Sequence, residues 1–253
     1  MKYFLLLLLP FFSFGYQEIP DMNPKLGYLV DKSPEGEIKF NKAKKTCDLL
    51  SQKVAQLDMD ENLSAADQAI YNACDMYLGS YWNILGPGDN WYDGGKEDTL
   101  SASSQLASYK GITYAASNAH DLNYKTVWAE GVKGYGIGET LTYNFPPQTA
   151  RVTDIIVVNG YVKSLKSWKE NSRVKKLKMY LNDEPIAILN LKDSRQQQSF
   201  SFEPMGVSER DNYDELMNKP WWSIKFEIME VYKGDKYDDT VITEIFLDGI
   251  DVY

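Results

Sequence analysis

The second half of the chain is built from short segments rich in β-branched and aromatic residues, each separated from the next by a turn. Several of these segments alternate apolar and polar residues, as in residues 224–228 (IKFEI), which is the period of a strand with one buried face. About eight short strands without intervening helices predict a mainly β protein folded as a β-sandwich. The expected strands are residues 112–117, 139–145, 153–159, 174–181, 185–191, 198–203, 223–232 and 241–247.

A helical pattern precedes this region. Apolar residues recur at three- and four-residue steps over residues 38–57, and a second helix is expected from Ser64, which resembles a capping box with Asp67. The two cysteines of the chain, Cys47 and Cys74, lie on the apolar stripes of these two helices. A small α-helical hairpin would bring the two thiols together as a disulfide, and two free, buried thiols are the alternative.

Residues 1–15 have the pattern of a secretory signal peptide. Lys2 precedes an apolar run over residues 4–12, and Ser13 and Gly15 place small residues at positions −3 and −1 of a cleavage site. The run is too short for a membrane span, and no other stretch is long and apolar enough to be one. We therefore expect a secreted or periplasmic protein, and such a compartment favours the Cys47–Cys74 disulfide.

A connector separates the two patterned regions. Residues 79–98 are rich in glycine, aspartate and aromatic residues, and their Gly-Pro-Gly and Gly-Gly sequences are typical of turns. The predicted organisation is a signal peptide at residues 1–15, an N-terminal helical region with its connector at residues 16–98, and the sandwich at residues 99–253.

The composition argues against several functions. The net charge of −9 disfavours nucleic-acid binding. The single histidine, His120, has no positioned nucleophile beside it, and one histidine with two cysteines does not supply a zinc site. The glycines at 131, 134, 136 and 138 do not match a dinucleotide-binding motif, so no organic cofactor is expected. An unrecognised enzyme site within residues 16–98 is the weakest alternative, because that region is small and contains no histidine.

Hard oxygen donors are crowded between residues 118 and 126. Asn118, Asp121, Asn123 and Thr126 are the residue types whose side-chain and carbonyl oxygens hold Ca²⁺ in loops. A calcium loop usually borrows a carboxylate from elsewhere in the chain, and composition alone does not identify it. The alternative is that these side chains bond the backbone of their own turns.

A basic and aromatic cluster follows within an otherwise acidic chain. Aromatic faces and forked donors suit sugar rings and their hydroxyl or carboxylate groups, and a solvated strand face is the equally weighted alternative. The cluster comprises Lys163, Lys166, Lys169, Arg173, Lys175, Lys176 and Lys178, set among Tyr161, Trp168 and Tyr180.

Several ordered blocks of the sequence together resemble a known family. They are residues 103–107 (SSQLA), 118–128 (NAHDLNYKTVW), 130–139 (EGVKGYGIGE), 159–164 (NGYVKS), 171–177 (NSRVKKL) and 230–249. This succession resembles the discoidin-like (coagulation factor type C) domain, and most closely its bacterial branch, the NAD glycohydrolase translocation or NADase-type glycan-binding domain. The resemblance covers about residues 100 to 253 and implies a galactose-binding-like jelly-roll β-sandwich.

The resemblance also implies a set of site residues. Related discoidin-type lectins bind carbohydrate through loops at one end of the sandwich, without catalysis, and a structural Ca²⁺ braces the first loop. The positions that match their metal ligands are Asp121, Asn123, Thr126 and Glu244. The positions expected to contact sugar are His120, Tyr161, Lys163 and Arg173, and Trp128 matches a residue that packs in the core.

The expected function is therefore that of an exported, non-catalytic carbohydrate-binding protein that recognises a glycan or glycoconjugate. The alternative from a different class is a protein–protein interaction or adhesion module whose loops are purely structural. Recovery of one partner protein, without competition by sugar, would favour that alternative.

Overall fold

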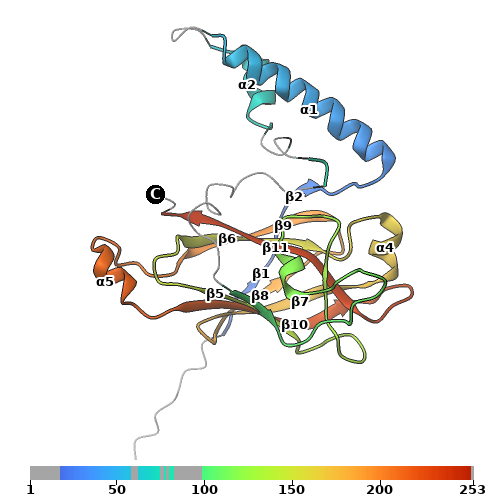
Figure 1. Ribbon diagram of the computed structural model, residues 1–253, viewed down its shortest axis with the longest axis vertical. Coiled ribbons are helices and arrows are strands. Elements are labelled where there is room, and N and C mark those ends of the chain that lie inside the picture. The colour runs from blue at the N-terminus through green and yellow to red at the C-terminus, as the bar shows by residue number, and fades with distance from the viewer. Residues whose placement is uncertain (1–17, 58–61, 75–76, 78–79, 83–98, 252–253) are drawn as a thin grey trace, which may run out of the picture.

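The computed structural model describes residues 18–57, 62–74, 77, 80–82 and 99–251, and it is mostly β (Figure 1). The signal peptide and most of the connector predicted from the sequence lie outside the described residues. The strands are β1 (Asp21–Met22), β2 (Lys25–Leu29), β3 (Thr99–Ala102), β4 (Trp128–Ala129), β5 (Thr140–Phe145), β6 (Arg151–Asn159), β7 (Ser172–Leu181), β8 (Glu184–Asn190), β9 (Gln196–Met205), β10 (Trp222–Tyr232) and β11 (Thr240–Ile250).

The strands form two facing layers. One layer has the order β2-β9-β6-β11, with β4 paired to β11, and the other contains β1-β8-β7-β10-β5-β3. The layers are joined where β11 pairs with β7 over the residue pairs Thr240–Ser172 and Val241–Arg173. Figure 1 shows the layers one above the other. The predicted mainly β, discoidin-like jelly-roll sandwich is confirmed.

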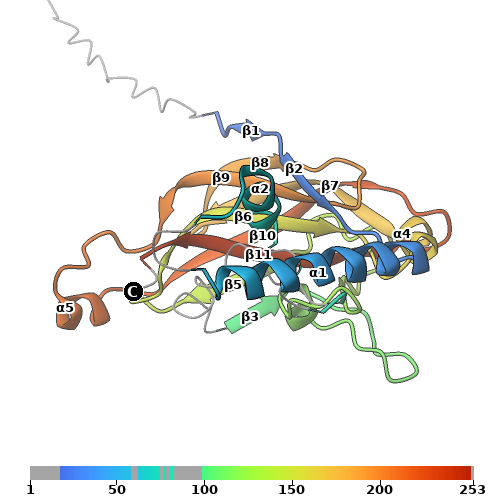
Figure 2. The ribbon, with the colours of Figure 1, turned by 90° about the horizontal axis from the view of Figure 1, so that it is seen from above.

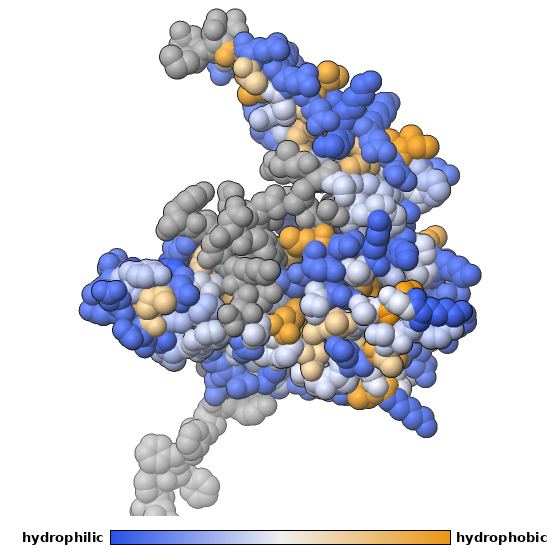
Figure 3. Space-filling model, viewed as in Figure 1, coloured by the Kyte–Doolittle hydropathy of each residue, from blue (hydrophilic) through white to orange (hydrophobic). Residues whose placement is uncertain are grey.

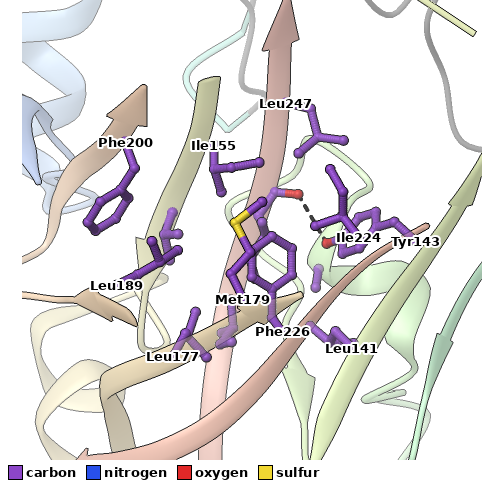
Figure 4. Close-up of a cluster of buried hydrophobic side chains, with 14 of the residues drawn as sticks. Leu141, Tyr143, Ile155, Leu177, Met179, Leu189, Phe200, Ile224, Phe226 and Leu247 are labelled. Carbon is purple, nitrogen blue, oxygen red and sulfur yellow. Dashed lines mark hydrogen bonds between the residues drawn. The ribbon is translucent and has the colours of Figure 1, made fainter. Parts of the chain in front are cut away.

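The main core lies between the layers. Strands β5 and β10 alternate buried and more exposed residues along their length, as the sequence pattern predicted, so every second side chain enters the core. Leu141, Tyr143 and Phe226 come from one layer and meet Ile155 and Leu247 from the other (Figure 4). Trp128 is fully buried in the same cluster, as expected. Its indole N–H donates to the carbonyl of Ser104 at 3.0 Å.

The sequence also explains some of the connections. Asn182 and Asp183 link β7 to β8 with φ of 50° and 67°, and these residue types tolerate the left-handed conformation that a two-residue hairpin turn requires. The predicted strand at residues 112–117 is wrong. Tyr109 and Ile112 form an isolated bridge around Gly111, whose φ is 79°, and the chain then enters the 3₁₀ helix η2 (Ala116–Ala119).

The helical hairpin is present. Helix α1 (Pro34–Val54) begins after Ser33, whose side chain accepts from the N–H of Gly36. Helix α2 (Ala65–Tyr71) begins after Ser64, whose side chain accepts from the N–H of Asp67 at 3.1 Å. These hydroxyls satisfy free N–H groups at the helix starts. The structure contains the predicted disulfide between Cys47 and Cys74. The shorter helices α4 (Leu165–Glu170) and α5 (Tyr213–Met217) lie within the sandwich region.

One segment before the hairpin belongs to the sandwich, which the predicted boundary at residue 99 does not anticipate. Strand β1 pairs with β8 in one layer, and β2 pairs with β9 in the other. We call residues 21–29 the strap, because this short segment adds a strand to both layers. Figure 2 shows the strap along one edge of the sandwich. Strands β8 and β9, which would otherwise be exposed at that edge, therefore both have hydrogen-bonding partners.

Within the described part of the chain, no helix is long and apolar enough to cross a membrane.

Candidate functional site

The loop between η2 and β4 holds most of the predicted metal ligands, and its own side chains keep it closed. The amide of Asn118 is buried and donates to the carbonyls of Thr113 and Val127, at 2.8 and 3.0 Å. We call residues 121–126 the recognition loop. Asn118 and the core anchor Trp128 fix its two ends on the sandwich.

Within the recognition loop, Asp121 is the centre of the hydrogen bonds. The hydroxyl of Thr126 lies 2.9 and 2.7 Å from the two carboxylate oxygens of Asp121, and the N–H of Asn123 donates to the same carboxylate at 3.0 Å. The side-chain oxygen of Asn123 accepts from the N–H of Lys125, while its carbonyl oxygen lies 3.0 Å from the hydroxyl of Thr126. The hydrogen bonds between these side chains and the backbone of their own turn, which the sequence left as an alternative to metal binding, are therefore present.

The structure brings Glu244 to this loop from β11. The Glu244 carboxyl group is fully buried, and its Oε1 accepts from the N–H of Asn123 at 2.8 Å. Burial, together with the nearby carboxylate of Asp121, holds the pKa of Glu244 well above its usual value, although the N–H groups of Asn123 and Leu122 act in the opposite direction. Its other oxygen, Oε2, has no hydrogen-bond partner among the described residues.

This donor set suits a hard cation. A buried carboxylate with an unsatisfied oxygen is stabilised by a positive charge, and Asp121, Thr126 and the carbonyl of Asn123 add oxygens to the same place. No group of three or more His, Cys, Asp or Glu side chains with metal-binding geometry occurs in the described part of the chain. Two carboxylates with neutral oxygens fit Ca²⁺ and do not fit zinc.

His120 and Arg173 lie inside the protein. His120 is 8% exposed, with Nδ1 2.8 Å from the carbonyl of Ile245 and its ring in an edge-to-face contact with Tyr143. Arg173 is 6% exposed, pairs with Asp193 at 2.7 Å and stacks on Trp168. Both side chains are engaged with the protein itself, so neither offers the surface that the predicted sugar contact requires.

Tyr161 contacts the recognition loop, and Lys163 follows it two residues later on the surface. Tyr161 is half-buried, and its hydroxyl donates to the carbonyl of Lys125 at 3.1 Å, while Lys163 is exposed. Tyr114 packs with Tyr161 against a small buried cluster at this end of the sandwich. Lys125 is exposed and lies between the predicted metal ligands Asn123 and Thr126. Sequence reasoning missed Tyr114 and Lys125, because their nearness to Tyr161 results from long-range packing.

Part of the remaining basic cluster is paired with acidic side chains. Glu230 binds Lys175 at 2.7 Å and Lys176 at 3.1 Å across neighbouring strands, and Lys166 lies 3.9 Å from Glu170. Such exposed pairs neutralise part of the local positive charge. For Lys175 and Lys176 the interpretation as a solvated strand face is the better one.

The family model described as "NAD glycohydrolase translocation F5/8 type C domain" matches residues 91–248. No curated protein matches the chain significantly in sequence.

Solved structures similar to the chain include three from Clostridium perfringens. CpGH89CBM32-5, solved in complex with GalNAc-β-1,3-galactose, is 13% identical with a TM-score of 0.41, over 60% of this chain and 94% of that one. The CBM32-1 and CBM32-2 domains of ZmpB with GalNAc are 13% identical with a TM-score of 0.44, over 79% and 55%. CBM32-1 of a family 31 glycoside hydrolase is 10% identical with a TM-score of 0.40, over 63% and 99%.

The family model covers more than half of the sequence and includes the recognition loop, Tyr161 and Glu244. The chain therefore belongs to the NAD glycohydrolase translocation F5/8 type C domain family.

Proposed function

We propose that the protein binds a glycan without catalysing its conversion, through the surface formed by Tyr114, Lys125, Tyr161 and Lys163. The observation that carries this proposal is the contact of Tyr161, which packs beside Tyr114, with Lys125 of the recognition loop. Lys163 is exposed two residues after Tyr161, and the loop is fixed at both ends. Tyrosine rings cover apolar faces of sugars, and ammonium groups donate to hydroxyl or carboxylate oxygens. Binding at one shallow site of this kind is expected to be weak.

A structural Ca²⁺ would brace the recognition loop. Asp121, Glu244, Thr126 and the carbonyl of Asn123 would hold it, and its charge would stabilise the buried carboxylate of Glu244. The ion would order the loop and would take no part in a reaction. Export to a secreted or periplasmic location accords with the signal-peptide pattern of residues 1–15 and with the Cys47–Cys74 disulfide.

A glycan array tests the binding surface. The unmodified protein should give hits that are lost in Tyr161→Ala and in Lys163→Ala. Lys166→Ala is the matched control, because Lys166 is a nearby lysine on α4, 82% exposed, that is not part of the proposed surface. Each variant is first shown to melt as the unmodified protein does. A folded protein that binds no glycan, or equal loss in all three variants, would contradict the proposed surface.

A second candidate is a protein-interaction module, and the helical hairpin is the observation that favours it. An apolar groove between α1 and α2 is lined by Ala43, Cys47, Ala69, Ile70 and Tyr77. Ile38 and Leu49 are also exposed, and Figure 3 shows hydrophobic residues along the hairpin surface. Capture of one partner protein that Ile70→Glu abolishes, with no competition by sugars, would favour this function over glycan binding.

A further inference from the structure

Lys32 is a buried cation at the junction between the hairpin and the sandwich. Its side chain is 7% exposed, and its ammonium group donates to the carbonyl of Tyr81. The nitrogen lies 4.1 Å from the ring centre of Tyr81 and 4.2 Å from that of Tyr124. The rings of Trp82 and Phe40 follow at 5.7 and 6.0 Å. These rings replace much of the water that a lysine normally holds.

The four rings come from segments that are far apart in the sequence. Phe40 lies on α1, Tyr81 and Trp82 follow α2, and Tyr124 lies inside the recognition loop. The N–H of Tyr124 donates to the carbonyl of Trp82 at 2.9 Å. The ammonium group of the next residue, Lys125, lies 5.1 Å from the Trp82 ring. Lys32 is therefore the point where the hairpin meets the recognition loop.

Both sides of this junction are braced. The hydroxyl of Tyr81 donates to the carbonyls of Asp31 and Ser33 at 2.6 and 2.9 Å, which fixes Tyr81 to the chain beside Lys32. Phe40 packs edge-on against Tyr81 with ring centres 5.5 Å apart. On the sandwich side, Gln197 of β9 donates to the hydroxyl of Tyr124 at 3.1 Å. A shift of one ring therefore disturbs its neighbours.

We propose that Lys32 makes the helical hairpin and the recognition loop one cooperative unit, so that displacement of the hairpin makes the loop less ordered. A buried ammonium group is stable only while its acceptor and its rings are in place. The hairpin supplies Phe40, the segment that follows α2 supplies Tyr81 and Trp82, and the loop supplies Tyr124. Release of the hairpin and the segment attached to it would therefore leave the charge without part of its surroundings. The meaning of this coupling for ligand binding rests on the proposed function, whereas the coupling itself does not.

Amide hydrogen exchange in the full chain, measured without ligand and in EDTA, tests the coupling. The reporter is the N–H of Asn123, which donates to the carboxylates of Glu244 and Asp121, both within the sandwich region. Lys32→Met keeps the apolar stem and removes the charge. Phe40→Ala perturbs the hairpin from a position whose ring contacts are Lys32, Tyr77 and Tyr81. Both variants should accelerate exchange at Asn123 by about tenfold.

Lys39→Met is the matched control, because Lys39 is an exposed lysine on α1, and it should leave the exchange of Asn123 unchanged. Faster exchange at the N–H of Tyr124 but not of Asn123 would show that the hairpin separates without loosening the loop, and it would overturn the proposal. Unchanged exchange at both amides would also overturn it. If Lys32→Met does not fold, Phe40→Ala and reduction of the disulfide perturb the same junction from the hairpin side. Since no sugar or metal is present, the outcome is independent of the glycan array.

Discussion

Glu244 and Asn123 are 121 residues apart, and the buried carboxylate of Glu244 accepts the backbone N–H of Asn123 at 2.8 Å. This bond connects the recognition loop to the strand that crosses the centre of the sandwich. It also leaves a buried oxygen of Glu244 without a partner among the described residues, beside the acidic side chain of Asp121.

Glu244→Gln should abolish stabilisation by calcium without destabilising the metal-free protein. Burial opposes the charge of Glu244, and a neutral amide removes that cost. Ca²⁺ at about a hundredfold excess over its Kd should raise the Tm of the unmodified protein by about 5–10 °C relative to EDTA, since such binding adds roughly 2.7 kcal/mol. Thermal melting checks both points. Glu203→Gln is the control at an exposed position, and a calcium response that persists in Glu244→Gln would contradict the site.

Replacing both cysteines by serine should destabilise the hairpin. The Cys47–Cys74 bridge closes a loop with a sequence separation of 27 residues, and closures of this length contribute about 3–4 kcal/mol in the chain-entropy model. Helix α2 has 7 residues, which is too short to persist without packing. Amide exchange over α2 should therefore accelerate strongly in the double variant. Addition of a dithiol should have the same effect on the unmodified protein and none on the variant. Slow exchange over α2 in the variant would show that packing alone suffices.

Arg173→Lys should destabilise the protein by about 2 kcal/mol, although it keeps the charge. The guanidinium group binds Asp193 with two nitrogens, donates to the carbonyls of Trp168 and Asn171, and stacks on the Trp168 ring. A lysine has no planar fork with which to make these contacts together. Urea denaturation measures the change, with Lys166→Ala as the surface control. Equal stability of Arg173→Lys and the unmodified protein would refute this structural role.

Asp251→Asn should lower stability at neutral pH and lose its effect in acid. The guanidinium group of Arg151 bonds Asp251, and together with Arg210 it holds the pKa of Asp251 below its usual value despite partial burial. A carboxylate with a lowered pKa stabilises the fold above its unfolded pKa near 4, and this stabilisation is lost as the pH falls through the native pKa.

The difference in the free energy of unfolding between the unmodified protein and Asp251→Asn should therefore be about 0.5–1 kcal/mol at pH 7 and shrink below about pH 4. Urea titrations between pH 7 and pH 2.5 measure it. Asp211→Asn, at an exposed position, should show no such pH dependence. A difference that stays constant across this range would show that the stabilisation does not come from the Asp251 charge.

Much of the fold could be predicted because the sequence patterns that specify its strands and helices are local. The alternation in β10 specifies which side chains enter the core, and the stripes that carry Cys47 and Cys74 specify how the two helices face each other. The juxtaposition of Asp121 and Glu244 has no local signal, and only the resemblance to a family suggested it.

Other features could not be read from the sequence for physical reasons. His120 is polar and lies in a loop, but its position depends on the carbonyl of Ile245, which is 125 residues away. The strap falls within residues 16–98, which the sequence assigned to the helical region. Its five-residue strand β2 has no periodicity, and its partner strands lie far along the chain. Residues 112–117 form the local bridge between Ile112 and Tyr109 and accept one hydrogen bond from the N–H of Ala129 at the carbonyl of Tyr114, but no ladder with a neighbouring strand of the described chain fixes them.

The strap also imposes an order of events during synthesis. Asp21 pairs with Ile188, so β1 has no partner until about two-thirds of the chain has followed it from the ribosome. Pairings over such separations form late, because a long intervening chain must first be brought together. We expect β1 and β2 to join the sandwich at the end of folding, after β8 and β9 have formed, and to close it as the last step.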